Sequence, residues 1–178
     1  FSGSRSEYSL LKNLFLKFKN SKKFKTKLIV SGSHMSSKFG KTISNINRDG
    51  IIPDYKIKVN ENFNTTKDIS TSISKLLIRS QSILKNFNPE LVILLGDRYE
   101  TYAIAMSCLI LNIPIAHLHG GEVTYGSFDD NIRHSITKLS HLHFVANKKF
   151  KKRVIQLGEE PKSIFVVGGL GVDNIKQT

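Results

Sequence analysis

The chain has 178 residues, of which 39% are hydrophobic, and this length suits one domain with a sizeable core. It holds no apolar run of about 18 residues and no signal-peptide pattern, so neither a transmembrane helix nor a membrane partner is expected. Its one cysteine, Cys108, lies in the apolar stretch AMSCLIL, which favours a buried, inert thiol and a cytoplasmic location.

The net charge of +13 raises the question of an anionic partner, such as nucleic acid or phosphate groups. The lysines are scattered, and no aromatic-rich RNA-binding signature accompanies them, so nucleic acid is not expected. Residues 97–130 differ from the rest, because they contain five acids, one arginine and no lysine. The lysines can simply cover solvated faces, and the acidic window is the sharper signal of function.

The predicted elements begin with the end of a strand at Phe1, followed by a helix that starts near Arg5. Residues 27–31 form a short β-rich run. Residues 64–87 place their apolar side chains on one helical face, with Thr65 or Thr66 as the cap and Asn88-Pro89 as the end.

Strands and helices then alternate along the rest of the chain. The predicted strands are 90–95, 113–119, 141–146 and 163–169, and the predicted helices are 99–112, 129–140 and 148–158. The run 90–95 is continuously apolar, as a parallel strand covered on both faces should be. This alternation predicts an α/β fold with a doubly wound parallel sheet of the Rossmann type.

In such sheets, ligands bind beyond the carboxyl ends of the strands, where the strand order reverses. The predicted junctions there are 2–8, 31–36, 95–100, 119–130 and 167–173, and each contains glycine. Several also carry Ser, Arg, His or a carboxylate. A loop that only reverses the chain does not need these groups, so the junctions are the predicted site.

The first junction places Gly3, Ser4 and Arg5 at a helix N-terminus, where backbone N–H groups and an arginine favour an anion. It lacks the endings of a Walker loop and of GxGxxG, and a plain capped turn explains it equally well.

Asp97 follows the apolar strand 90–95 directly. If this strand is the fourth in the order 3-2-1-4-5, Asp97 faces the loop that carries Arg5. The alternative is that Asp97 caps the next helix. Its neighbour Arg98 is then either an ion-pair partner or a ligand contact.

The longest junction carries His119, Glu122, Asp129 and Asp130. Carboxylates close together have raised pKa values, which makes a general acid or base that works near neutral pH. The alternative is that Asp129 and Asp130 cap the following helix.

Five of the six histidines lie between positions 117 and 143. HxH pairs without cysteine support are weak zinc signals, so no metal site is predicted. His117 and His141 are expected in or near the core, whereas His119 stands at a strand's carboxyl end and is the better functional candidate.

The motifs GDRYE (96–100), IPIAHLHGGEVTYGSFDDNIRHSITKLSHLHFVA (113–146) and RVIQLGEEPKSIFVVGGLGVDNI (153–175) together resemble one family. The chain is similar to the hydrolysing UDP-N-acetylglucosamine 2-epimerases of sialic acid biosynthesis and their relatives in legionaminic acid biosynthesis. The resemblance extends over essentially the whole chain from SGSRSEYSLL onward, and residues 94–145 carry its most specific part.

The resemblance implies two Rossmann-like domains of the glycosyltransferase B type, with a nucleotide sugar between them. It implies that UDP leaves carbon 1 as the carbon-2 proton is removed, which gives 2-acetamidoglucal. Water addition then gives N-acetylmannosamine. It implies no metal or redox cofactor, and it implies a homo-oligomer for the full-length protein.

The candidate site residues come from two sources. The junctions themselves contribute Gly3, Arg98 and His119. The resemblance, carried over position by position, assigns the others, which are Arg5, His34, Asp97, Glu122, Asp129, Arg133 and His134. The candidate catalytic residues are Asp97, His119, Glu122 and Asp129. The candidate substrate-binding residues are Gly3, Arg5, His34, Arg98, Arg133 and His134. Some relatives have Glu at the position of His119, which leaves open the role of that side chain here. Which acid removes the carbon-2 proton also stays open.

The expected organisation is one N-terminal domain over residues 1–170, with 171–178 beginning the connection to a C-terminal nucleotide-binding domain. Without that domain the chain is expected to be inactive. Three alternatives remain: a hydrolysing epimerase for GDP-N-acetylglucosamine or a UDP-diacetamido sugar, a non-catalytic nucleotide-sugar-binding module, and a nucleic-acid-binding domain suggested by charge alone.

Overall fold

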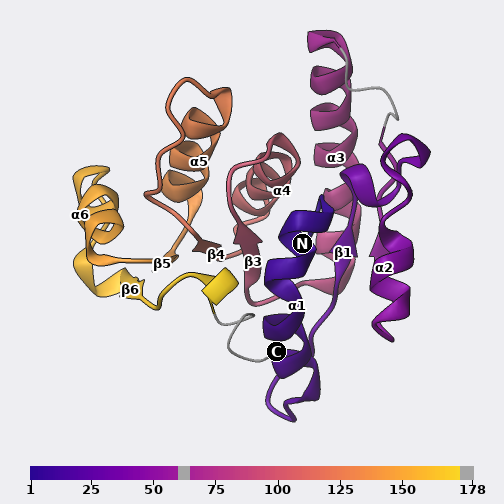
Figure 1. The fold of residues 1–178 in the computed structure, drawn as a ribbon, viewed down its shortest axis with the longest axis horizontal. Helices are drawn as coiled ribbons and strands as arrows, with labels where there is room; N and C mark the ends of the chain where they lie inside the picture. Colours follow the sequence, from indigo (N-terminus) through magenta and orange to yellow (C-terminus); the bar gives the residue numbers. More distant parts are fainter. Residues whose placement is uncertain (60–64, 173–178) are drawn as a thin grey trace.

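The computed structural model describes residues 1–59 and 65–172 and contains a parallel α/β fold (Figure 1). One sheet has the strand order β3-β4-β5-β6, formed by Val92–Leu95, Ile115–Leu118, Leu142–Val145 and Ile164–Val166. A second parallel pair consists of β1 (Ile29–Val30) and β2 (Tyr55–Lys56).

Residues 1–2 lie between the two groups of strands. Ser2 pairs in parallel with Val30, and the amino group of Phe1 donates to the carbonyl of Ile93 at 3.3 Å. Residues 1–2 therefore act as the first strand, and β3 is the fourth, as the sequence predicted. The carboxyl ends of all these strands meet at one edge.

Six α-helices connect these strands in the described part of the chain. They are α1 (Arg5–Asn20), α2 (Ile43–Arg48), α3 (Thr66–Phe87), α4 (Tyr99–Ile110), α5 (Phe128–Leu139) and α6 (Lys148–Gln156). Short 3₁₀ turns cover Gly32–His34, Ser37–Phe39 and Pro161–Ser163. Figure 1 shows α4, α5 and α6 in a row along one side of the strands.

Local sequence sets the ends of α3. Thr65 accepts from the backbone N–H of Asp68, and the Asp68 side chain accepts from the backbone N–H of Thr65, which forms a capping box. At the other end Asn88 adopts the left-handed conformation before Pro89. The predicted cap at Thr65 and end at Asn88-Pro89 are confirmed. The short α2 and β2 were not predicted, because two to six residues are too few to show a period.

The two faces of the sheet pack against different helices. Leu94 of β3 packs with residues of α3, α4 and α5, whereas Leu95 packs with Leu11 of α1 and Leu118 of β4. This explains why the strand at 92–95 is apolar at every position. Helices on both faces confirm the predicted doubly wound parallel sheet.

Cys108 is fully buried in the same core as Leu94, and burial raises the pKa of its thiol to about 12. The predicted burial is confirmed. The backbone of residues 170–172 is helical, and residues 173–178 of the expected connection lie outside the described residues.

Candidate functional site

The polar junctions follow the carboxyl ends of parallel strands and therefore share one edge of the molecule. Two groups of contacts form among them. The first group surrounds Arg133 and includes residues of the junctions after β3 and β4. The second joins the first junction to the turn at Gly32 and to the start of α4.

The centre of the first group is the ion pair between Asp97, at the end of β3, and Arg133 of α5. Arg133 is only 6% exposed, and it also donates to the hydroxyl of Thr124 at 3.1 Å. Asp130 lies 3.6 Å from the same guanidinium. Arg133 thus links the end of β3 with the loop that precedes α5.

Burial raises the pKa of Asp97 above its ordinary value, and the nearby Asp129 adds to the rise, although Arg133 opposes both. Asp97 is not the cap of α4, because the N-cap position is Arg98 and no side chain caps that helix. The capping interpretation of Asp97 is therefore wrong. The ionic partner of Asp97 is Arg133 of α5, and the expectation that Asp97 faces the loop that carries Arg5 stays a prediction.

His119 and Glu122 form a second pair in the same junction. His119 Nδ1 lies 2.7 Å from Glu122 Oε1, and the His119 backbone is left-handed with φ of 65°. Burial alone would raise the pKa of Glu122, but the hydrogen bond and charge of His119, together with Arg133, bring it below its ordinary value. Within the described residues His119 Nε2 is buried without a hydrogen-bond partner.

The acids of α5 interact with the loop before the helix. The N-cap is Ser127, whose hydroxyl donates to Asp129 Oδ2 at 3.0 Å. Asp130 accepts from the backbone N–H of Thr124 at 2.9 Å, and its other oxygen lies 3.6 Å from His134 Nε2. The predicted capping therefore belongs to Ser127, and both acids order the loop that faces Arg133.

The remaining predicted residues occupy the second group. The Arg5 side chain is exposed at the first turn of α1, behind the N-cap Ser4. His34 is fully buried, with Nε2 2.9 Å from the Ser2 hydroxyl and Nδ1 2.8 Å from the Thr42 hydroxyl. Burial lowers the pKa of His34 to about 4, so the ring is neutral near pH 7.

Arg98 pairs with Glu100 rather than with Asp97. Its Nη2 and Nε donate to the two carboxylate oxygens at 2.9 and 3.2 Å. Glu100 is fully buried, whereas the Arg98 side chain is 39% exposed. One face of the guanidinium therefore stays accessible at the edge of the sheet.

Sequence reasoning missed Glu7, a buried acid on α1. Its Oε2 accepts from the backbone N–H of Gly3 at 2.6 Å, and its Oε1 accepts from the Thr101 hydroxyl at 3.3 Å. Ser4 and Glu7 have the spacing of a capping box, and this pattern could have identified Glu7. The Glu7 side chain reaches one residue further back than that motif requires.

Burial raises the pKa of Glu7 to about 7, despite the Gly3 hydrogen bond and the charge of Arg98. The ordinary value is 4.5. Between these two values the folded chain binds more protons than the unfolded chain, so the free energy of unfolding falls as pH rises through this window. The full loss is on the order of 3 kcal/mol, from about 1.4 kcal/mol per pKa unit.

Glu7→Gln should remove this dependence, because glutamine is the uncharged analogue of the protonated acid. We expect the variant to be as stable as the unmodified chain at pH 5 and more stable at pH 8, on the order of 2–3 kcal/mol. Urea unfolding of the 178-residue chain at both pH values measures it. Glu90→Gln, at an exposed acid, is the control. Equal pH dependence in all three proteins would contradict the assignment.

The burial of the histidines differs in part from the prediction. His117 is fully buried, with Nε2 2.8 Å from the Gly96 carbonyl and Nδ1 3.2 Å from the Thr137 hydroxyl, as expected. His141 is exposed, so its predicted core position is wrong, and His143 is the buried one. The reason is that His141 lies just before β5, whereas His143 lies within the strand and its side chain is fully buried.

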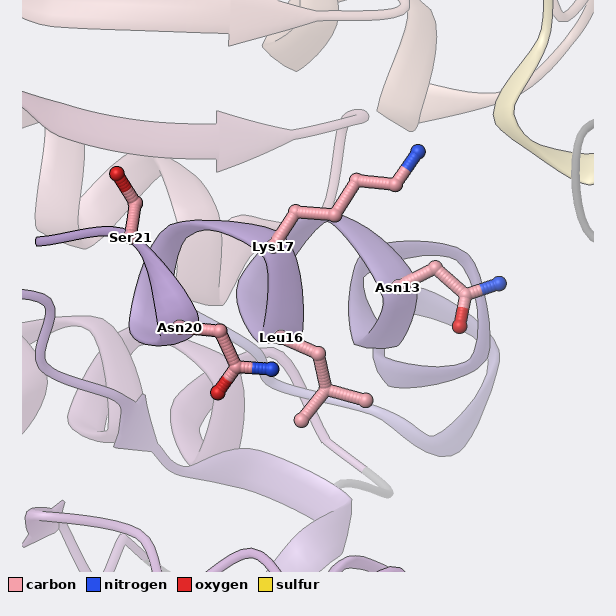
Figure 2. Close-up of a pocket in the computed structure, with 5 residues that line it drawn as sticks. All are labelled: Asn13, Leu16, Lys17, Asn20 and Ser21. Atoms are coloured by element: carbon pink, nitrogen blue, oxygen red, sulfur yellow. The ribbon is translucent and has the colours of Figure 1, made fainter.

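One hollow lies apart from this edge, and the described residues form neither a metal-ligand cluster nor a membrane-spanning helix. Figure 2 shows a shallow hollow on the C-terminal half of α1, lined by Asn13, Leu16, Lys17, Asn20 and Ser21. In residues 1–59 and 65–172, no three His, Cys, Asp or Glu side chains converge as metal ligands. None of the helices in these ranges combines the length and hydropathy that crossing a membrane requires.

Comparison with known proteins agrees with the fold and gives the family. Residues 16–178 match the family described as UDP-N-acetylglucosamine 2-epimerase. The chain is 40% identical, over 98% of its length, to the GDP/UDP-N,N'-diacetylbacillosamine 2-epimerase (hydrolyzing) of Campylobacter jejuni, and 35% identical, over 99%, to the corresponding UDP-N,N'-diacetylbacillosamine enzyme of Legionella pneumophila.

The crystal structure of UDP-GlcNAc 2-epimerase from Neisseria meningitidis, bound to UDP-GlcNAc, superposes with a TM-score of 0.87 at 18% identity. The superposition covers 99% of this chain and 47% of the Neisseria chain. The chain likewise spans 45% of the Campylobacter relative and 46% of the Legionella relative, which is consistent with the N-terminal half of a glycosyltransferase-B-type fold. The chain belongs to the UDP-N-acetylglucosamine 2-epimerase family.

Proposed function

We propose that the chain is the N-terminal half of a hydrolysing 2-epimerase that converts UDP-N-acetylglucosamine to N-acetylmannosamine and UDP, in sialic-acid-type sugar biosynthesis. The observation that carries the proposal is the group around Arg133. Asp97 follows β3, whereas Glu122 and Asp129 belong to the segment after β4. The charge of Arg133 acts on both Asp97 and Glu122, and that of Asp129 acts on Asp97.

The chemistry needs a base, a proton donor and stabilisation of separated charge. The base takes the carbon-2 proton, and the C–H electron pair forms the carbon 1–carbon 2 double bond while UDP leaves with the C–O pair. In the water addition, an O–H bond of water breaks, its oxygen bonds to carbon 1 and its proton passes to a carboxylate of the site. Carbon 2 then receives a proton on the opposite face, and the proton taken in the first step leaves to solvent. No external oxidant or cofactor is required.

We assign the base to Asp97, because a carboxyl whose pKa is raised above its ordinary value is the more effective proton acceptor. Arg133 orients it. The His119–Glu122 pair, with its 2.7 Å contact, is assigned to proton delivery and water positioning. Asp129 adds to the raised pKa of Asp97. His134, which lies 3.6 Å from Asp130, is assigned to contact the sugar or its acetamido group.

Arg5 and Arg98 are assigned to the diphosphate. Both lie at the sheet edge, both carry accessible guanidinium groups, and Arg98 is pre-oriented by Glu100. Gly3 and His34 shape the first junction behind them. This arrangement gives the leaving group two fixed positive charges.

The family resemblance leads us to propose a cytoplasmic homo-oligomer whose domain of residues 1–170 works with a second, nucleotide-binding domain reached through 171–178. The 178-residue chain alone should then release no UDP from UDP-N-acetylglucosamine. UDP release by this chain would contradict the two-domain proposal.

A second substrate class is a nucleotide-linked diacetamido sugar, as in a legionaminic-type pathway. It is favoured by the 40% and 35% identity to relatives named for N,N'-diacetylbacillosamine. GDP-N-acetylglucosamine is a further candidate, since the base-contacting residues are expected in the other domain.

The test uses the full-length gene product. It is incubated with UDP-N-acetylglucosamine, GDP-N-acetylglucosamine and UDP-N,N'-diacetylbacillosamine, and the released nucleotide and sugar are identified by mass spectrometry and NMR. We expect UDP and N-acetylmannosamine from the first. If UDP is released only from UDP-N,N'-diacetylbacillosamine, the substrate belongs to the second class, the nucleotide-linked diacetamido sugars. Binding without release supports a non-catalytic module, and salt-dependent binding of DNA or RNA in its place would support a nucleic-acid domain.

A further inference from the structure

Two buried carboxyls, Glu7 and Glu100, lie beneath the first junction, and the proposed chemistry uses neither. Glu7 is 7% exposed and Glu100 is fully buried. Both are directed toward the junction, since a Cβ added to Gly3 would lie 3.3 Å from Glu7 Oε2 and 3.3 Å from Glu100 Cβ. Burying two acids side by side is costly, so their positions need an explanation.

Both backbone polar groups of Gly3 are hydrogen-bonded. Its N–H donates to Glu7 Oε2 at 2.6 Å, while its carbonyl accepts from the backbone N–H of Ser33 at 2.9 Å and from the Ser33 hydroxyl at 3.2 Å. Gly32 approaches so closely, at φ +58°, that a Cβ there would lie 2.5 Å from the Gly3 carbonyl oxygen. Three junctions therefore meet at Gly3.

Glu7 connects this meeting point to α4. Its second oxygen accepts from the hydroxyl of Thr101, three residues beyond Arg98. Glu100, between these two positions, holds the guanidinium of Arg98 through both oxygens. One buried pair of acids thus fixes the backbone before Arg5 and the side chain of Arg98.

We propose that Glu7 is a positioning residue for diphosphate binding, because its carboxyl fixes Gly3 and thereby sets the Ser4–Arg5 turn beside Arg98. This inference rests on the proposed nucleotide-sugar site. Glu7 touches no substrate in this scheme. It acts through Gly3, whose N–H is already occupied by Glu7 and is therefore not a donor to the phosphate.

The test measures UDP affinity by calorimetry, and KM and kcat with UDP-N-acetylglucosamine, in the full-length gene product. Glu7→Ala should weaken UDP binding and raise KM by about tenfold, from the loss of the hydrogen bond that holds Gly3, while kcat stays within about twofold. Glu7→Gln should bind UDP nearly as well as the unmodified protein, because its amide oxygen accepts from Gly3 and its NH₂ donates to Thr101.

Two controls separate positioning from folding. Glu7→Asp keeps the charge but shortens the side chain, so it should resemble Glu7→Ala in KM. Glu90→Gln, at an exposed acid, should match the unmodified protein in every measurement. If Glu7→Ala and Glu7→Asp only lower the urea midpoint and the folded protein binds UDP normally, the positioning role is overturned.

The binding measurement also separates this inference from the proposed function. If the unmodified protein binds UDP but releases none from any sugar, the catalytic proposal fails, and the Glu7 variants still decide the positioning role. If the unmodified protein binds no UDP, the diphosphate site and the role of Glu7 are both overturned.

Discussion

Asp97→Asn in the full-length gene product is expected to lower kcat for UDP release by at least about 10³-fold, since a positioned acid–base group contributes about 10²–10⁴-fold. Asparagine keeps the shape of the side chain, and its amide oxygen can still accept from Arg133. It cannot take up a proton at neutral pH. The expected loss is therefore in the chemical step, and KM should change far less than kcat.

The raised pKa of Asp97 also predicts the pH profile of the unmodified protein. As the proposed base, Asp97 must be ionised, so kcat/KM should fall as pH drops through a value above the pKa of an ordinary aspartate. This acidic limb should disappear from the residual rate of Asp97→Asn. Steady-state rates measured from pH 4.5 to 9 distinguish the two profiles.

Asp49→Asn is the matched control for this substitution. Asp49 is exposed, but it also accepts from a basic residue, Lys12, at 2.6 Å, and as the C-cap residue of α2 it lies outside the group around Arg133. Its replacement should leave kcat unchanged. A normal rate for Asp97→Asn, with intact folding by circular dichroism, would show that Asp97 is a structural partner of Arg133 and no more.

The elements of this fold were predictable wherever a period extends over several turns. The helix at 66–87 shows a full apolar stripe with a cap at each end, and the strand at 92–95 is apolar throughout because both of its faces are covered. The first strand and β1 were harder to assign, since β1 has two residues and the bridge to it from the first strand is made by Ser2 alone. The hydrogen bond from the Phe1 amino group to the Ile93 carbonyl places the first strand beside β3.

The site was predictable in its residue types and less so in its pairings. A parallel sheet places every strand-to-helix junction at one edge, and this rule identified Asp97, Glu122 and Asp129 together. It could not identify Arg133 as the partner of Asp97, because the direction of α5 sets that contact. The capping-box spacing of Ser4 and Glu7 could have identified Glu7, but its contact with Thr101, which spans 94 positions of sequence, could not be predicted.

Arg133→Met is expected to destabilise the 178-residue chain by about 3–5 kcal/mol at pH 8, the range for removing one partner of a buried ion pair. Methionine fills part of the volume but leaves the Asp97 carboxylate without its counter-charge. It also removes the 3.1 Å hydrogen bond to Thr124 and the nearby charge that faces Asp130.

The size of this loss should depend on pH. Without Arg133 the folded-state pKa of Asp97 rises further above its unfolded value, because the guanidinium now opposes that rise. The folded variant then binds an extra proton at low pH, and the cost of ionising Asp97 appears as pH increases through its new pKa. The difference in unfolding free energy from the unmodified chain should therefore be smaller at pH 5 than at pH 8.

The double variant Asp97→Asn/Arg133→Met tests whether the unpaired charge causes the loss. With neither charge present, the pH-dependent part should vanish, and at pH 8 the double variant should be more stable than Arg133→Met alone. Arg79→Met, at an exposed arginine of α3, should change stability by no more than about 0.5 kcal/mol. If the double variant is the less stable of the two at pH 8, Arg133 stabilises the fold through its packing and its contacts to the loop at Thr124, and the ion pair with Asp97 contributes little.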